Sequence, residues 1–271
     1  MTDEAAVAPG PGFDTSVSHS ARIWNYWLGG KDNYAVDRAA GDRVAAMLPS
    51  IVAQARADRA FLGRAVRLLA GEAGVRQFLD IGTGLPTAEN THQVAQHVAP
   101  DARIVYADND PLVLVHARAL LSSTPQGACD YVDGDVHEPE AILAEAGKTL
   151  DFGQPTALML LGILHHVPDT DEAYSIVRRL MDALSPGSYL VINHSTSAIH
   201  GEAMEDAVRH WNKVGTPSMT LRTVDEITRF FDGLELLPPG VVSCSRWRPV
   251  VTAGEREPDE VDEFCGVARK P

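Results

Sequence analysis

The heptapeptide DIGTGLP, residues 80–86, ends the apolar run of a predicted strand and carries two glycines, Gly82 and Gly84, one residue apart. A glycine turn at the carboxyl end of a strand lets the backbone approach a ligand, as in the nucleotide-binding turns of α/β proteins. A pyrophosphate there would be repelled by the Asp80 carboxylate, so the loop favours a ligand that carries positive charge. Pro86 predicts that a helix begins at this point, because proline fits the first helical turn.

Strand and helix patterns alternate after this loop. The predicted strands cover residues 76–81, 102–108, 129–134, 156–162 and 188–194, and the predicted helices lie near 87–98, 111–121, 139–146, 171–184 and 223–232. Such alternation predicts right-handed βαβ units and a doubly wound α/β fold whose parallel sheet is covered on both faces. The stretches LELLPPGVV (234–242) and FCGVARK (264–270) leave no room for a crossover helix. We therefore expect the last strand to run antiparallel.

The chain divides into regions of different composition. We predict a disordered tail (1–18), an N-terminal helical lid or extension (19–75) with helices near 36–47 and 53–70, and a Rossmann-like domain (76–271) with a cap insertion (195–222). The tail is rich in Gly, Pro and small polar residues, which favours disorder. Four arginines form a stripe on the helix near 53–70, Arg56, Arg59, Arg64 and Arg67. We favour a solvated face for this stripe over an anion site.

The composition narrows the class of partner. The 271 residues include 23 Lys+Arg and 37 Asp+Glu, and the net charge of −14 disfavours nucleic acid and anionic membranes. The longest apolar run, ALMLLGIL (157–164), is too short to cross a bilayer. The three cysteines show neither disulfide nor metal-site spacing, and the N-terminus lacks a signal-peptide pattern. We expect a cytoplasmic protein with a small-molecule partner and no metal, and leave its oligomeric state open.

Acids stand at the ends of three successive predicted strands: Asp80, Asp108 and Asp135. A dinucleotide fingerprint would need a third glycine where Thr87 stands, so NAD is a poor fit. S-adenosylmethionine (SAM) carries an ammonium, a sulfonium and no phosphate, so acids beside it are favourable. We expect Asp108 to accept both ribose hydroxyls, and Asp135 with the backbone of Val136 to bind the adenine. The candidate cofactor residues of this domain are Asp80, Gly82, Gly84, Asp108, Asn109, Asp135, Val136 and Gly162.

Each acid also has a structural interpretation. Asp80 could only fix the loop through backbone N–H groups, and the segment DGD around Asp135 is often just a turn. Asp110 could cap the helix that follows it, which would leave Asp108 for the ligand. The joint placement of the acids at one edge of the sheet favours cofactor binding.

Several segments resemble the actinobacterial S-adenosyl methyltransferases, formerly a domain of unknown function. They are ARIWNYWLGGKDNYAVDR, FLDIGTGLPT, VYADNDPLVLVHARALL, YVDGDVHEPEAIL, LLGILHHVPD, LSPGSYLVINH, RFFDGLEL and GVARKP. The resemblance covers nearly the whole chain from His19. It implies a class I methyltransferase fold, with a seven-stranded sheet and an antiparallel last strand, that binds SAM. It does not imply an acceptor.

Methyl transfer mainly requires alignment of the acceptor with the methyl group and the exclusion of water. A hydroxyl or ammonium acceptor also needs a base, for which His165, His166 and His194 are candidates. Since adjacent histidines point in different directions, at most one of His165 and His166 is expected to face the ligand. A packing or hydrogen-bonding role is the alternative for each.

Two further segments are expected to cover the site. Tyr26, Lys31 and Asn33, beside a glycine pair, are predicted to contact the cofactor from a lid, the alternative being that this segment only packs the first helices. The cap insertion is expected to line the acceptor pocket through Met204, His210, Trp211 and Met219, with Arg222 placed to pair with an acceptor carboxylate.

These observations favour a SAM-dependent methyltransferase acting on an unidentified small molecule, such as a secondary metabolite. One alternative is a SAM-binding regulatory module that performs no methylation. An NAD-dependent oxidoreductase is disfavoured by Thr87.

Overall fold

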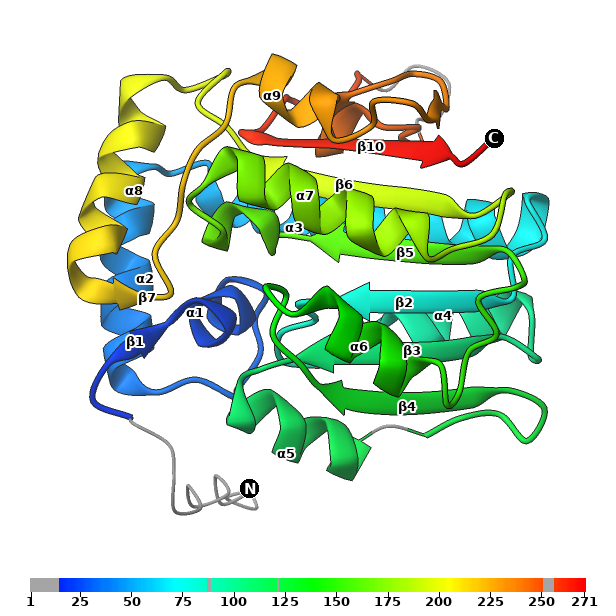
Figure 1. Cartoon of the computed structure of the whole chain (residues 1–271). Helices are drawn as coiled ribbons and strands as arrows, with labels where there is room; N and C mark the ends of the chain where they lie inside the picture. Colours follow the sequence, from blue (N-terminus) through cyan, green and yellow to red (C-terminus); the bar gives the residue numbers. More distant parts are fainter. Residues whose placement is uncertain (1–14, 87–88, 121, 251–255) are drawn as a thin grey trace.

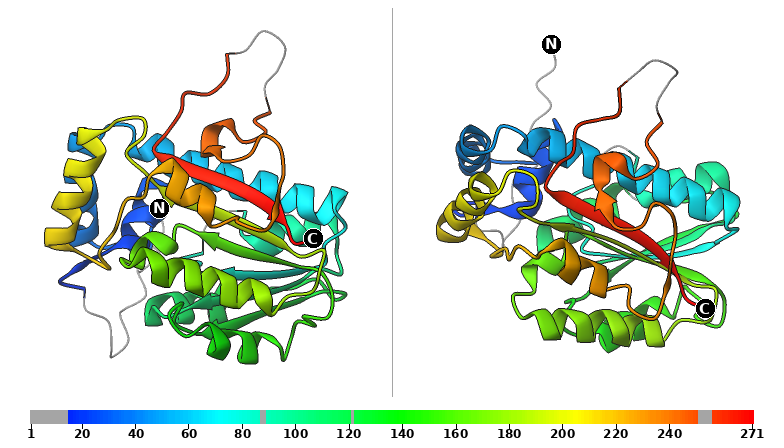
Figure 2. Two further views of the ribbon diagram at one scale, coloured as in Figure 1. Left: turned by 45° about the horizontal axis from the view of Figure 1, so that its top comes forward. Right: turned by 90° about the horizontal axis from the view of Figure 1, so that it is seen from above.

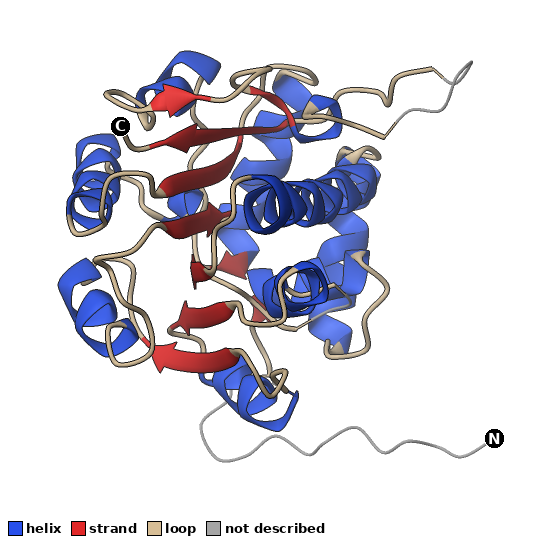
Figure 3. Ribbon diagram, turned by 90° about the vertical axis from the view of Figure 1, so that its right-hand side faces the viewer, coloured by secondary structure: helices blue, strands red, loops and turns tan. Residues whose placement is uncertain are grey.

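A mixed sheet with helices on both faces forms the centre of the computed structural model, which describes residues 15–86, 89–120, 122–250 and 256–271 (Figures 1 and 3). Along the sheet the strands are β4 (Ala128–Asp133), β3 (Arg103–Asp108), β2 (Gln77–Ile81), β5 (Thr156–Leu161), β6 (Tyr189–Ser195), β10 (Glu263–Arg269) and β8 (Glu235–Leu236). The first five run parallel, and β10 is antiparallel to β6, to β8 and to the short strand β9 (Val242–Ser243). The predicted doubly wound fold with an antiparallel last strand is confirmed.

Alternate residues of the central strands point to opposite faces, and each face has its own core. One core joins Leu79, Val105 and Leu158 with the helices α6 (Pro139–Ala146) and α7 (Thr170–Asp182). The other joins Phe78, Ile104 and Met159 with α3 (Ile51–Arg67) and α4 (Thr91–Val98). Both faces of β2 are buried, and none of its five residues is exposed, although Gln77 and Asp80 are polar.

The predicted start of one helix is wrong. Pro86 does not begin α4, whose first residue is Thr91. Asn90 caps this helix, and its backbone N–H donates to the Gln93 side chain at 2.9 Å. This reciprocal capping box satisfies the first N–H groups of the helix more fully than a proline at an earlier position would.

The first two helices of the chain lie at the carboxyl ends of the parallel strands, together with α8 (Glu202–Val214). Figures 1 and 2 show α2 (Ala35–Met47) beside α8, and Val44, Met204 and Val208 share a small core there. Directly before α1 (Ser20–Trp27), the two-residue strand β1 (Ser18–His19) pairs in parallel with β7 (Gly215–Thr216). The predicted extension and the predicted cap therefore contact each other.

The remaining helices are α5 (Pro111–Leu120), α9 (Val224–Arg229) and the short turns η1 (Leu68–Glu72), η2 (Leu164–His166) and η3 (Cys244–Arg246). Most of the predicted disordered tail, and Thr87, lie outside the described residues. No helix in the described part of the chain is both long enough and apolar enough to span a membrane.

Candidate functional site

A cavity of about 230 Å³ lies where the central strands end, beneath α1 and between α3 and α8. Strand ends contribute Asp80, Asp108 and Gly162, while α1 contributes Trp24 and α8 contributes Met204. The strand order reverses between β2 and β5, and ligands of doubly wound sheets bind at such a reversal. The cavity therefore occupies the position that the sequence predicts for the cofactor.

The glycine loop after β2 requires glycine at Gly82. This residue has φ 77°, and an added Cβ would lie 2.6 Å from the Cβ of Ile163. Gly84 also has a positive φ, 60°, and its backbone N–H donates to Oδ2 of Asp108 at 2.8 Å. The end of β3 therefore holds the loop in shape.

The Asp108 carboxylate is partly buried at the cavity wall. Its Oδ1 accepts the backbone N–H of Asp110 at 2.9 Å, while Asp110 itself caps α5 by accepting the N–H of Leu112 at 2.8 Å. Asp110 therefore caps α5 as predicted, and the cofactor contact of Asp108 stays a prediction. Each oxygen of Asp108 keeps a lone pair for a further donor. Burial raises the pKa of Asp108 to about 6.

Asp80 faces the same cavity and is almost fully buried. Its Oδ2 accepts the hydroxyl of Thr91 at 2.6 Å, so the carboxylate also fixes the first turn of α4. Burial raises the pKa of Asp80 to about 6, against the opposing effects of Thr91 and Arg59. Asp80 thus lines the cavity and supports the structure of the loop region at the same time.

Two residues of α3, Asp58 and Arg59, line the cavity without having been singled out as site residues from the sequence. Asp58 accepts hydrogen bonds from the side chains of Asn193 and Trp24, and burial raises its pKa to about 6. Arg59 donates to Oδ1 of Asn90 at 2.9 Å. The solvated face favoured for the arginine stripe is therefore wrong for Arg59, because a ligand cavity covers that part of α3.

Not all predicted cofactor residues lie at the cavity wall. Asn109 and Gly162 line it together with the acids and glycines already described. Asp135 stands behind Asn109, accepting its amide at 3.3 Å and contacting Nδ1 of His137 at 2.7 Å. Neither Asp135 nor Val136 is among the described lining residues, and their contact with adenine stays a prediction.

The predicted lid residues point elsewhere. The Tyr26 hydroxyl donates to Asp42 at 2.7 Å, and the Asn33 amide donates to Oδ1 of Asn25 at 3.0 Å. Lys31 is exposed. Within the described residues, the same segment reaches the cavity through others: His19, Ser20, Ala21, Ile23, Trp24, Asn25, Trp27 and Leu28. Cofactor contacts of Tyr26, Lys31 and Asn33 stay predictions.

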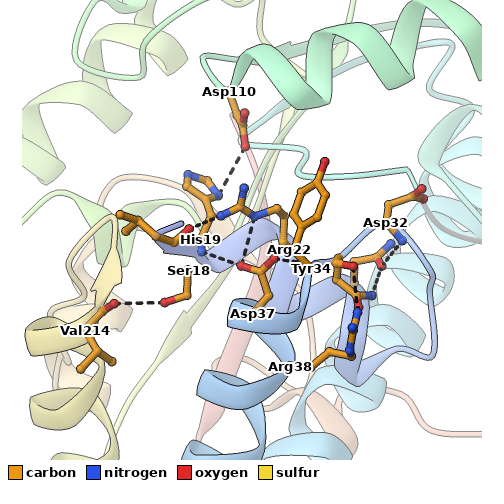
Figure 4. A network of polar contacts seen from close by, with 12 residues as sticks. Ser18, His19, Arg22, Asp32, Tyr34, Asp37, Arg38, Asp110 and Val214 are labelled. Carbon is orange, nitrogen blue, oxygen red and sulfur yellow. Dashed lines mark hydrogen bonds and ion pairs between the residues drawn. The ribbon is translucent and has the colours of Figure 1, made fainter. Parts of the chain in front are cut away.

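A polar network fastens this segment across the cavity (Figure 4). The Ser18 hydroxyl donates to the carbonyl of Val214 at the end of α8, at 3.0 Å. Buried Asp37 accepts the backbone N–H of His19 at 3.0 Å and pairs with Nε of Arg22 at 3.1 Å. Nδ1 of His19 lies 3.4 Å from the carboxylate of Asp110. The network, which we call the strap, therefore joins the cap to the start of α5.

Two adjacent histidines, His165 and His166, line the cavity in a hydrogen-bonded chain. Nδ1 of His166 lies 2.8 Å from the carbonyl of Ser218 and must donate to it, so Nε2 of His166 accepts from Nε2 of His165 at 3.2 Å. Burial lowers the pKa of His165 well below its ordinary value and that of His166 to about 4. The lowered pKa values make both rings weak proton acceptors, and their nitrogens are already engaged, which weighs against the predicted role as bases; that role stays a prediction.

His194 and Arg222 lie behind the cavity wall and have structural roles. Arg222 donates to the carbonyls of Leu164 and Val167 at 2.8 and 2.7 Å, and its guanidinium lies 2.7 Å from Nε2 of His194. Neither residue is among the described lining residues, and neither is His210, whereas Met204, Trp211 and Met219 do line the cavity. Arg222 is therefore occupied with the turn that carries the two histidines.

The residues present fit SAM. Three carboxylates, Asp58, Asp80 and Asp108, face the cavity with one guanidinium, Arg59, which suits a ligand of net positive charge that also carries a carboxylate. Gly82 and Gly84 line the cavity with backbone alone, so a ligand can approach the loop closely there. Within the described part of the chain, no group of three or more potential ligands could hold a metal ion.

Comparisons with known proteins agree with this fit. A family model described as S-adenosyl methyltransferase matches residues 7–271. A DUF574 family protein from Streptomyces avermitilis has 44% identity and a TM-score of 0.89, over 95% of this chain and 99% of that one. A candidate methyltransferase from Thermobifida fusca has 42% identity and a TM-score of 0.87, over 98% of this chain and 99% of that one. No curated protein matches the chain.

Proposed function

The chain belongs to the S-adenosyl methyltransferase family, and we propose that it transfers the methyl group of SAM to a small-molecule acceptor bound beneath α1 and α8. It is a SAM-dependent methyltransferase with a Rossmann-like fold. The observation that carries the proposal is the single cavity that runs from the carboxylates at the strand ends to the apolar side chains of α8. We propose that the cofactor occupies the part of this cavity at the strand ends and the acceptor the part lined by α8.

The cofactor is assigned to the strand ends. Asp108 accepts the ribose hydroxyls with the lone pairs that its two backbone hydrogen bonds leave free, and Asn109 with Asp135 forms the adenine edge. Asp80 faces the positive charges, and Arg59 binds the carboxylate of the methionine moiety. In these assignments each buried charge at this end of the cavity, Asp80 and Arg59, faces a ligand group of opposite charge.

SAM supplies a methyl group on a positively charged sulfur, which makes it ready for in-line displacement. The protein's contribution is to align the acceptor and to keep water out. The Trp24 indole and the strap cover the cavity on the side of α1, which supports this role. The three cysteines are free, which supports a reducing, cytoplasmic location.

The test is incubation of the full chain with methyl-labelled SAM and the low-molecular-mass fraction of a cell extract. We expect the label to appear in a small-molecule product with the wild-type chain and not with Asp108→Ala. Tight binding of SAM without any transfer would instead support a regulatory module. Label found in protein or nucleic acid when whole extract is used, and absent from the small-molecule fraction, would contradict a small-molecule acceptor.

A further inference from the structure

The part of the cavity away from the glycine loop is a chamber with an apolar wall and a polar end. This inference rests on the proposed function and concerns the acceptor. The apolar wall is formed by Trp27, Val44, Ile51, Met204, Val208 and Trp211. We call this region the acceptor chamber. Two of its six wall residues are indoles, which suits an aryl group.

Gln54 marks the polar end of the chamber. It lines the cavity, is only 1% exposed, and donates from Nε2 to Oε2 of Glu263 at 2.9 Å. Its Oε1 is buried and has no hydrogen-bond donor among the described residues. A buried carbonyl oxygen without a donor is unfavourable, so this atom points to a ligand that donates a hydrogen bond.

The orientation of Gln54 is fixed from behind. Glu263 is fully buried and accepts, on the same oxygen, the hydroxyl of Ser195 at 2.7 Å. Ser195 and Glu263 are directly paired residues of β6 and β10, so the sheet itself holds both groups. The amide nitrogen of Gln54 is thus turned toward the sheet, and its oxygen is the one polar atom of this cavity-lining side chain that has no donor among the described residues.

Asp58 lies one helical turn after Gln54, on the same face of α3. The Asn193 and Trp24 side chains use two of its lone pairs, which leaves others for a ligand. The chamber end therefore offers an amide oxygen and a carboxylate, both acceptors. The neighbouring histidines are neutral, and the one positive charge of Arg59 is shared between the carboxylates of Asp58 and Asp80. An anionic acceptor would be repelled here and a cationic one attracted.

We infer that the methyl acceptor is an amine on an apolar, aryl-sized body, whose nitrogen donates hydrogen bonds to Oε1 of Gln54 and to the carboxylate of Asp58. The ammonium form binds and gives one proton to Asp58. The freed nitrogen lone pair forms the N–C bond as the C–S bond breaks, and that electron pair stays on sulfur. The methylated ammonium leaves, and Asp58 returns its proton to solvent.

The test compares three probes that share a phenethyl body: phenethylamine, 2-phenylethanol and 3-phenylpropanoate. Each is titrated into the full chain saturated with S-adenosylhomocysteine, and binding is followed by tryptophan fluorescence, since Trp24, Trp27 and Trp211 line the cavity. We expect the amine to bind at least about tenfold more tightly than the alcohol, and the carboxylate to bind more weakly still.

Two variants sharpen the test. Gln54→Leu and Asp58→Asn are each expected to weaken phenethylamine binding about tenfold and 2-phenylethanol binding by much less. Gln154→Leu, an exposed glutamine outside the cavity, serves as the matched control and should change neither. Equal binding of the three probes, no binding of the amine, or equal losses for amine and alcohol in both variants would overturn the inference.

Calorimetry with S-adenosylhomocysteine alone separates this inference from the proposed function. If the wild-type chain does not bind that molecule, the proposed function fails. If it binds and the amine shows no preference, only the amine inference fails.

Discussion

Asp108 connects the glycine loop to the start of α5, because it accepts the backbone N–H groups of Gly84 at 2.8 Å and of Asp110 at 2.9 Å. A carboxylate serves here better than an amide, because one carboxylate can accept four hydrogen bonds. Two backbone donors and two ribose hydroxyls would use that capacity fully. The residue therefore couples the shape of the loop to the presence of the cofactor.

Asp108→Ala is expected to weaken the binding of SAM by about 2–4 kcal/mol, because two charge-assisted hydrogen bonds are lost. Isothermal titration calorimetry measures this directly. The control is Asp133→Ala, an exposed acid at the paired position of β4, which should leave the affinity unchanged. Wild-type affinity in Asp108→Ala would mean that the ribose is held by other residues.

Glu263 makes the folded protein sensitive to pH. Burial and the charge of Asp58 raise its pKa from 4.5 to about 8. Between those values the folded state binds a proton that the unfolded state has released, so the free energy of unfolding falls as the pH rises toward 8. Above the folded pKa the cost of burying the charge is present in full.

Glu263→Gln is therefore expected to raise the melting temperature at pH 8 and to change it little at pH 5, where Glu263 is already protonated. Each kcal/mol gained shifts Tm by roughly 2–4 °C for a chain of this size. Calorimetric melting curves of both proteins at pH 5 and pH 8 test this. A melting temperature lowered equally at both pH values would contradict a protonated Glu263.

At the scale of elements, the sequence predicts strands better than helix starts. The predicted strand at 102–108 became Arg103–Asp108, since a run buried on both faces is recognisable from its apolar residues alone. The start of α4 was misplaced because two local signals competed, and the capping box of Asn90 and Gln93 prevailed over Pro86. The motif N-x-x-Q was visible in the sequence and would have given the correct start.

The strap includes one buried ion pair, which joins Arg22 of α1 to Asp37 of α2. Arg22 and Asp37 are 5% and 0% exposed, and Asp37 also holds the backbone of His19 and Tyr34. Breaking a buried pair leaves an uncompensated charge, which costs about 3–5 kcal/mol. We expect the loss of this pair to weaken the packing of the N-terminal segment on α2 and to leave the central sheet unchanged.

Arg22→Gln is expected to accelerate amide hydrogen exchange in residues 15–34, with little change in β2 and β5, and to weaken SAM binding about tenfold or more. Exchange measured by mass spectrometry locates the effect. Arg43→Gln is the matched control, because Arg43 is an exposed residue of α2 that is not part of the strap. Equal acceleration across the sheet would show that the ion pair stabilises the whole fold instead.

At the scale of the molecule, the cavity is built from parts that are distant in sequence. The sequence predicted that the site lies at the carboxyl ends of the strands, and Asp80, Gly82 and Asp108 line the cavity there. Gln54 and Asp58 were missed because a helix has several polar residues, and only the packed structure shows which of them face a cavity. The same holds for Glu263, which lies one residue before the predicted strand 264–270 and which the structure places at the start of β10, paired with Ser195 of β6.

The three buried carboxylates of the cavity all gain their protons over the same pH range. The pKa values of Asp58, Asp80 and Asp108 are each raised to about 6 by burial, so these groups are ionised at pH 7 and mostly protonated at pH 5. The pKa of His166 is lowered to about 4, and its ring stays neutral across this range. A cationic ligand requires the ionised carboxylates, so its affinity must fall as the pH falls through 6.

We therefore expect the dissociation constant of SAM to rise from pH 7 to pH 5 by about tenfold for each carboxylate that must ionise. Calorimetry at pH 5, 6 and 7 measures this, with the uncharged 5′-methylthioadenosine as a control that should respond less. Asp80→Asn should flatten the pH dependence for SAM and leave that of the control nearly unchanged, because Asp80 is assigned to the charged end of the ligand. The same steep response for both ligands would contradict a role for the charges of SAM. It would instead place the effect on the ribose contact of Asp108, which both ligands share, or on the fold of the cavity.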